Sequence, residues 1–188
     1  MGTKAKDAAI WLFAICAGIS AVTESTAAYW TAVSMAGWLG CYYVWYLPKA
    51  RRESRKAGLK AVVLLPLYPW YARGLLYLTE LCLKTLRLDG CWIEAYEVHI
   101  ENITKDRYYK TLKTDLKLMM QKKKTLYIWE TSAPIPAEFR KLFAQLKNEG
   151  RAFWVKGRWP IPRVPGTSLG IKDKYARIGA VIWEGDAE

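Results

Sequence analysis

Two long apolar runs dominate the first quarter of the chain. Residues 8–22 (AAIWLFAICAGISAV) and residues 27–47 (AAYWTAVSMAGWLGCYYVWYL) are separated only by the short stretch TEST. A membrane-spanning helix needs roughly 20 apolar residues, and a helix satisfies its own backbone polar groups in lipid. The pattern therefore predicts a transmembrane helical hairpin over residues 1–48.

Small and aromatic residues support this prediction. Four small residues recur at every fourth position of the second run and predict close helix packing, within the molecule or between copies in a homo-oligomer. They are Ala28, Ala32, Ala36 and Gly40. Trp30 near one end of this run and Tyr42 to Tyr46 near the other suit the headgroup level. Two alternatives remain: a soluble hairpin in a large core, and a cleaved signal peptide, because Lys4 and Lys6 precede a short apolar run.

The positions of lysine and arginine predict the orientation of the hairpin. Lys4 and Lys6 lie before the first run, six cations lie within residues 49–60, and the connecting stretch carries none. Cytoplasmic flanks of membrane spans are enriched in Lys and Arg. We therefore expect a bacterial inner-membrane protein with both termini in the cytoplasm.

Residues 61–87 are harder to assign. The run AVVLLPLYPWYA is too short to span a membrane, and Pro66 and Pro69 interrupt any helix there. Arg73, Glu80, Lys84 and Arg87 then share one helical face beside many leucines, which is typical of an amphipathic interfacial helix. We predict a basic juxtamembrane segment and an interfacial helix over residues 49–88. A core helix of the following domain and a third span are the alternatives. The predicted membrane-surface cations are Arg51, Arg52, Arg55, Lys56, Arg73, Lys84 and Arg87.

Residues 89–188 change to the pattern of a small α/β domain. CWIEAYEVHIEN alternates like a half-exposed strand, an amphipathic helix follows from near Thr104, and TLYIWE is a compact apolar strand. PAEFRKLFAQLKNEG predicts a second helix ending at Gly150, and RAFWVKG and KYARIGAVIWEG predict two further strands. The predicted order is β-α-β-α-β-β, in two or three layers on the cytoplasmic side.

Two groups of polar residues are candidates for a site in this domain. Glu130, Thr131 and Ser132 follow a predicted central strand, where α/β sheets commonly form a binding crevice, although the serine could simply cap the next helix. Glu97, His99 and Glu101 share one strand face and could act as acid and base or hold a cation. A solvent-facing strand explains the second group more simply.

Charge and cysteine content narrow the function only slightly. The 188 residues carry a formal net charge of +12, and six lysines form a predicted basic face: Lys110, Lys113, Lys117, Lys122, Lys123 and Lys124. Such a face fits a membrane surface, a nucleic-acid backbone or plain solvation. The four cysteines form no CxxC pair, so we predict that they are small buried hydrophobic residues in a reducing compartment. We expect neither a metal nor a cofactor.

No catalytic motif is present in the sequence, so we expect recognition rather than catalysis. Two N-terminal spans, a basic segment at residues 49–60 and a compact polar C-terminal domain resemble the layout of entry-exclusion proteins of conjugative plasmids. The resemblance implies a membrane-protein partner in the transfer apparatus of an incoming donor, and it carries over no functional residue. A membrane-tethered nucleic-acid binder and a membrane enzyme acting on a lipid-linked or nucleotide substrate are the alternatives.

Overall fold

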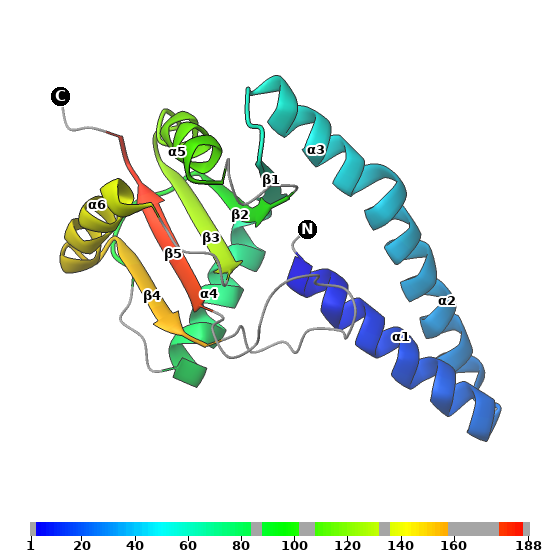
Figure 1. Ribbon diagram of the computed structural model, residues 1–188. Coiled ribbons are helices and arrows are strands. Elements are labelled where there is room, and N and C mark those ends of the chain that lie inside the picture. Colours follow the sequence, from blue (N-terminus) through cyan, green and yellow to red (C-terminus); the bar gives the residue numbers. More distant parts are fainter. Residues whose placement is uncertain (1–2, 84–87, 102–107, 132–135, 158–176, 186–188) are drawn as a thin grey trace.

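The computed structural model describes residues 3–83, 88–101, 108–131, 136–157 and 177–185. The first described element is helix α1 (Thr3–Thr23), followed by α2 (Thr26–Cys41), the π-helical turn η1 (Tyr42–Tyr46) and α3 (Leu47–Lys56). Glu24 adopts a positive φ of 54° at the turn, and Ser25 caps α2 by accepting a hydrogen bond from the Ala28 N–H at 3.4 Å. α1 and α2 form a helical hairpin whose arms lie closest near this turn and diverge toward the rest of the protein (Figure 1).

Only part of the predicted transmembrane hairpin is shown. Among the described residues, one helix is long and apolar enough to cross a membrane, namely Lys4–Thr23. Only 17% of this apolar stretch is buried, so most of the helix is exposed in the structure. α2 is 16 residues long before the π-helical turn begins, and a second span is not shown.

A five-stranded mixed sheet forms the centre of the domain. Its strands are β1 (Val62–Leu67), β2 (Glu94–Ile100), β3 (Thr125–Thr131), β4 (Ala152–Lys156) and β5 (Arg177–Trp183), in the order β1-β2-β3-β5-β4. β2 and β3 are parallel, and the other neighbours are antiparallel. The crossover between the parallel strands contains α5 (Tyr108–Met119).

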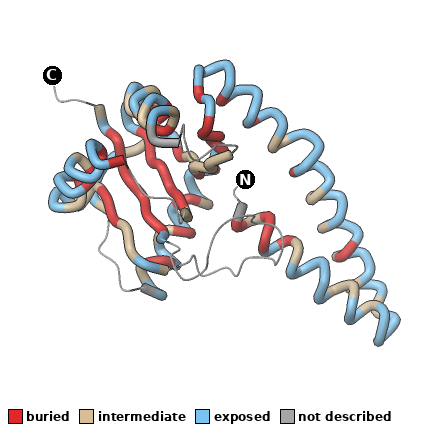
Figure 2. The backbone as a smooth tube through the Cα atoms, viewed as in Figure 1, coloured by how far each residue is buried: buried red, intermediate tan, exposed pale blue. Residues whose placement is uncertain are grey.

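Helices cover both faces of the sheet. α5 and α6 (Ala137–Asn148) lie on one face, where Leu112, Phe139 and Phe143 join the core. α4 (Pro69–Leu83) lies on the other face, with Ala72 and Leu75 buried against it. Figure 2 shows the buried residues concentrated in the strands and in the first turn of α1, whereas most of the hairpin is exposed.

The predicted order of elements in residues 89–188 is confirmed as β2-α5-β3-α6-β4-β5. Residues 62–83 differ from the preferred prediction, because Val62–Leu67 forms an edge strand of the same sheet, and the inner face of α4 joins the core, as the core-helix alternative expects. The sheet of the α/β domain therefore begins at Val62 and not after residue 89. Pro66 is exposed within β1, which an edge strand tolerates because it needs no ladder donor there.

Gly179 provides a test of the packing at the centre of the sheet. This residue lies on β5 opposite Trp129 of β3, and a Cβ atom there would lie 2.6 Å from Trp129 Cε2 and 2.7 Å from the Phe153 carbonyl oxygen. Gly179→Ala should destabilise the protein by about 1–3 kcal/mol, because this core has no room for a methyl group. Thermal unfolding of the full chain in detergent micelles measures the change.

The matched control is Gly74→Ala on α4. A Cβ atom there has no heavy atom within 4 Å outside its own helix backbone. Alanine is favoured over glycine in a helix interior by about 0.5–1 kcal/mol, so this variant should be slightly stabilised. Equal melting temperatures for the two variants would contradict the described packing.

Candidate functional site

Buried charges gather at the carboxyl ends of the parallel strands β2 and β3. Along β3, Ile128 and Glu130 point to the same face of the sheet because side chains alternate. On β2, Ala95 and Glu97 share that face, which is the one covered by α4. The two carboxylates therefore lie on one sheet face, at the edge where α/β proteins commonly bind ligands.

The first turn of α1 occupies this place. Lys4 Nζ lies 3.0 Å from Glu130 Oε2, and the two side chains are only 2% and 3% exposed. Lys4 also lies 3.7 Å from Asp7, its neighbour on the same helical face, and Lys6 lies 3.2 Å from Asp7. Burial of charges is unfavourable unless they are paired, so the Lys4–Glu130 pair holds the start of α1 against the sheet, and the two contacts of Asp7 pair the remaining charges within the helix.

Tyrosines from two other elements border this cluster. Tyr46 of η1 donates a hydrogen bond to the Pro66 carbonyl oxygen of β1 at 2.5 Å. Tyr42, only 2% exposed, stacks on Trp38 with ring centroids 6.0 Å apart. Burial raises the pKa of the Tyr71 hydroxyl on α4, and the Glu97 and Asp7 carboxylates raise it further. Tyr71 is therefore neutral and contributes a dipole, not a charge, to the cluster.

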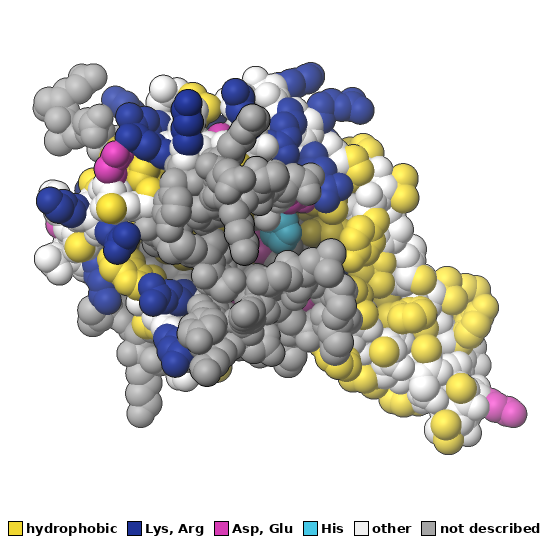
Figure 3. All heavy atoms as spheres, viewed as in Figure 1, with side chains coloured by type: hydrophobic (Ala, Val, Ile, Leu, Met, Phe, Trp, Pro, Cys, Tyr) yellow, Lys and Arg dark blue, Asp and Glu magenta, His cyan; other side chains and the backbone are white. Residues whose placement is uncertain are grey.

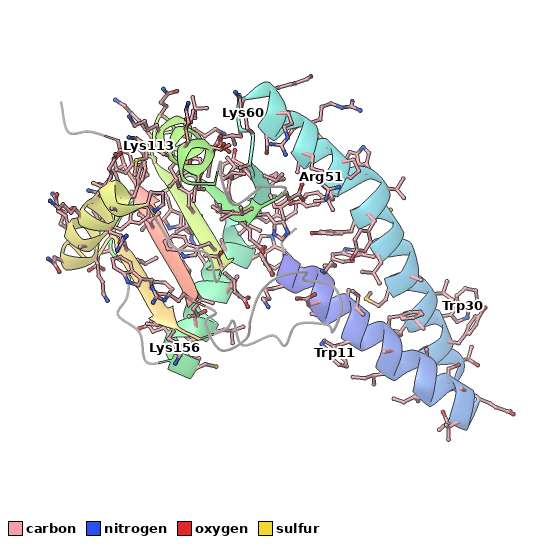
Figure 4. The ribbon with its side chains drawn as sticks, viewed as in Figure 1. Trp11, Trp30, Arg51, Lys60, Lys113 and Lys156 are labelled. Atoms are coloured by element: carbon pink, nitrogen blue, oxygen red, sulfur yellow. The ribbon has the colours of Figure 1, made fainter. Side chains whose placement is uncertain are left out.

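A second set of contacts attaches α3 to the domain. The Arg51 Nε–H donates a bifurcated hydrogen bond to the two Glu101 carboxylate oxygens, with Nε 3.0 and 3.1 Å away, and Nη2 donates to Oε1 at 2.8 Å. This interaction raises the pKa of Arg51. Ser54 Oγ accepts a hydrogen bond from the Leu64 N–H of β1 at 2.9 Å. Figure 4 shows Arg51 on α3, and Trp11 and Trp30 on α1 and α2 of the hairpin. Both ends of the hairpin are thus attached to the sheet.

The structure brings Glu97 and Glu130, one member of each predicted polar group, to the same sheet face, and places the other members in different environments. Glu130 of the candidate crevice is in the ion pair with Lys4, Thr131 is half-buried, and Ser132 lies outside the described residues. The expectation that Glu97 faces solvent is wrong, because this side of β2 is covered and Glu97 is buried. His99 is half-buried and Glu101 is bound by Arg51.

Sequence reasoning missed Lys4, Lys6 and Asp7 as members of this cluster. The two lysines were assigned to the cytoplasmic flank of a membrane span, yet both are buried in protein contacts. One signal was available. Asp7 is an acidic residue directly before an apolar run. A carboxylate in or beside a membrane span is usually paired with a cation or another polar group.

The predicted membrane-surface cations have different environments. Arg52, Arg55 and Lys56 are exposed on α3, and Arg55 donates to the Leu59 carbonyl oxygen at 2.9 Å. Arg73 lies over the Trp92 ring at 5.3 Å. Lys84 and Arg87 lie outside the described residues. Lysine and arginine side chains gather over the α3 and α5 side of the view in Figure 3, whereas the hairpin surface is mainly apolar.

The predicted basic face is partly neutralised by acidic neighbours. Lys113 lies 2.6 Å from Glu138, and Lys122 lies 3.6 Å from Glu94 and donates to the Tyr96 hydroxyl at 3.0 Å. The remaining four lysines of this face are exposed, namely Lys110, Lys117, Lys123 and Lys124.

The small-residue stripe of α2 is only partly used in packing. Ala32 is buried and Ala28 is half-buried, close to the turn where the two arms approach each other. Ala36 and Gly40 are exposed, where the arms diverge. Two of the four residues of the predicted helix-packing surface are therefore exposed in the part of the chain that the structure describes.

The cysteines differ from their predicted environment. All four thiols are free, but Cys41, Cys82 and Cys91 are exposed and only Cys16 is half-buried. The interpretation of all four as buried hydrophobes is therefore wrong for three of them. Within the described ranges, no three His, Cys, Asp or Glu side chains gather as a metal site would need.

Comparisons with protein families, curated proteins and solved structures found no match to the chain. The interpretation of the contacts between the hairpin and the sheet therefore rests on their own geometry.

Proposed function

We propose that the protein is a membrane-anchored recognition module, in which an N-terminal hairpin spans the bacterial inner membrane and a cytoplasmic α/β domain binds another membrane protein. The observation that carries this proposal is the attachment of both ends of the hairpin to one sheet, through Lys4–Glu130 and Arg51–Glu101. A hairpin attached in this way has its free turn, with Glu24, far from the domain (Figure 1).

The length and surface of the second arm support its role as a second span. α2 contributes 16 residues and η1 a further 5, which at about 1.5 Å per residue is close to the thickness of a bilayer core. Large apolar side chains are exposed on both arms, among them Ile15, Val22, Trp30, Val33 and Val44. A monomeric soluble protein rarely exposes so many large apolar groups together, whereas lipid solvates them.

The exposed cations of α3 support a cytoplasmic domain. Arg52, Arg55 and Lys56 follow the end of the second arm, and cations next to a span favour the cytoplasmic side. Tethering confines the search for a membrane partner to the bilayer plane and raises its effective concentration. The layout resemblance to entry-exclusion proteins leads us to propose a transfer-apparatus membrane protein as the partner, and exclusion of a related conjugative plasmid as the result.

The experiment combines mating with crosslinking in recipient cells. A photocrosslinking residue is placed at Lys110, Lys117 or Lys141, all exposed on α5 and α6. We expect the chain to lower transfer of a related plasmid but not of an unrelated one, and to crosslink to a membrane protein of the mating apparatus. Unchanged transfer of every plasmid tested, with the chain present in the membrane fraction, would contradict plasmid exclusion. Crosslinks to nucleic acid alone would favour the tethered nucleic-acid binder instead.

A further inference from the structure

The outer face of α4 carries large apolar side chains that nothing in the described structure covers. Trp70, Tyr77, Leu78 and Leu81 recur at helical spacing on this face, and Trp70 is 72% exposed. The opposite face of the same helix is in the core, where Ala72, Leu75 and Thr79 are buried. A helix that is apolar on both sides needs a second apolar environment.

The start of α4 lies where the hairpin meets the domain. Tyr71 lies close to the Ala5 backbone and within electrostatic reach of Asp7, in the first turn of α1. On the other arm, Tyr46 donates to the Pro66 carbonyl oxygen, three residues before α4 begins. Residues 66–71 therefore contact both ends of the hairpin. In α1, the apolar run begins directly after this contact, at Ala8.

Exposed aromatic side chains lie close to these contacts in the sequence of both α4 and the second arm. Tyr68 and Trp70 stack with ring centroids 6.3 Å apart, and both rings are exposed. Tyr43 and Trp45, at the end of the second arm, are exposed as well. Amphipathic rings of this kind favour the boundary between hydrocarbon and headgroups.

We propose that the outer face of α4, defined by Trp70, Tyr77, Leu78 and Leu81, lies in the headgroup region of the same bilayer together with Tyr68 just before the helix, and is a third attachment of the domain to the membrane. This inference rests on the proposed membrane anchoring. Its occupant is lipid because residues at the start of α4 contact both ends of the hairpin, whose two arms are proposed to lie in the bilayer. Arg73 on α4, held over the Trp92 ring at 5.3 Å, places a cation beside it for lipid phosphates.

Attachment through α4 would fix the orientation of the sheet. α4 covers one face, and α5 and α6 cover the other. With α4 on the membrane, α5 and α6 face the cytoplasm. The surface available to a cytoplasmic partner domain is then the one that carries Lys110, Lys117 and Lys141, all exposed.

Spin-label depth measurements test this arrangement on the full chain in vesicles of phosphatidylcholine and phosphatidylglycerol. The four native cysteines are replaced by serine, and single cysteines are introduced at Trp70, Tyr77 or Leu81. Collisions with oxygen, which partitions into lipid, are compared with collisions with a water-soluble nickel chelate. Lys141→Cys on α6 is the matched aqueous control, and Val33→Cys on α2 is the lipid reference.

We expect the ratio of oxygen to nickel collisions at the three α4 positions to be several-fold higher than at Lys141→Cys and to lie between that ratio and the ratio at Val33→Cys. A ratio at α4 equal to that of Lys141→Cys would overturn the proposal. Shielding of the α4 labels from both reagents would also overturn it, because a protein surface would then be the occupant. An aqueous ratio at Val33→Cys would instead contradict the membrane anchoring itself.

Discussion

Replacing Lys4 with methionine is expected to destabilise the protein by about 3–5 kcal/mol, because the buried Glu130 carboxylate would lose the Lys4 ammonium. The pair is 3.0 Å apart, and neither side chain is more than 3% exposed. The loss should lower the melting temperature of the full chain in detergent micelles by about 10 °C. Amide hydrogen exchange should increase most in the first turn of α1.

The control is an exposed ion pair elsewhere in the chain. Lys49 and Glu53 lie 3.9 Å apart with side chains 55% and 56% exposed, so Glu53→Gln should change stability by less than about 1 kcal/mol. The double variant Lys4→Met/Glu130→Gln should recover part of the loss, because it removes both charges of the pair. If Lys4→Met shifted the melting temperature no more than Glu53→Gln, α1 would not be held to the sheet by this pair.

Asp115 gives the second large expected effect. This residue of α5 is completely buried, and its carboxylate accepts hydrogen bonds from the backbone N–H groups of Lys60, Ala61 and Val62 at 2.7 to 3.0 Å. It therefore holds the start of β1 and the end of the connection from α3. Asp115→Ala would leave these donors without their acceptor, and each such buried group costs about 1–3 kcal/mol. For three donors this gives a total loss of roughly 3–9 kcal/mol.

Hydrogen exchange locates this effect. In Asp115→Ala, the Lys60, Ala61 and Val62 amides should exchange faster by about two orders of magnitude. Thr114→Ala is the neighbouring control, because the exposed Thr114 hydroxyl only donates to the Lys110 carbonyl oxygen of its own helix. If these three amides exchanged at the same rate in Asp115→Ala and in Thr114→Ala, Asp115 would not hold β1.

The local pattern of the sequence predicted much of the α/β domain. β3 reads as a compact apolar run because it lies at the centre of the sheet, with Leu126 to Trp129 buried. α6 shows its buried stripe of Phe139, Phe143 and Leu146, and Gly150 follows it with a φ of +73°. Each of these signals depends on neighbours within a few residues, which is the range that periodicity reports.

Other features depend on residues far apart in the sequence and could not be predicted in this way. β1 is paired with β2, with Leu65 opposite Glu97, and nothing near Pro66 indicates that partner. The alternation of polar and apolar residues along β2 correctly predicted that Glu97 points to the sheet face opposite to the apolar side chains of this strand. Its burial depends on α1, α4 and η1, which approach from elsewhere in the chain. The Lys4–Glu130 pair likewise joins the two ends of a long stretch of sequence.

Cysteine labelling in intact bacteria tests the central claim most directly, namely that the hairpin crosses the inner membrane while the α/β domain stays in the cytoplasm. Single cysteines replace Glu24 in the hairpin turn and Lys141 on α6, both exposed, in a chain without native cysteines. The account predicts that a maleimide unable to cross the inner membrane labels Glu24→Cys in intact cells, and labels Lys141→Cys only after that membrane is permeabilised. Labelling of Lys141→Cys in intact cells, or of Glu24→Cys only after permeabilisation, would contradict it.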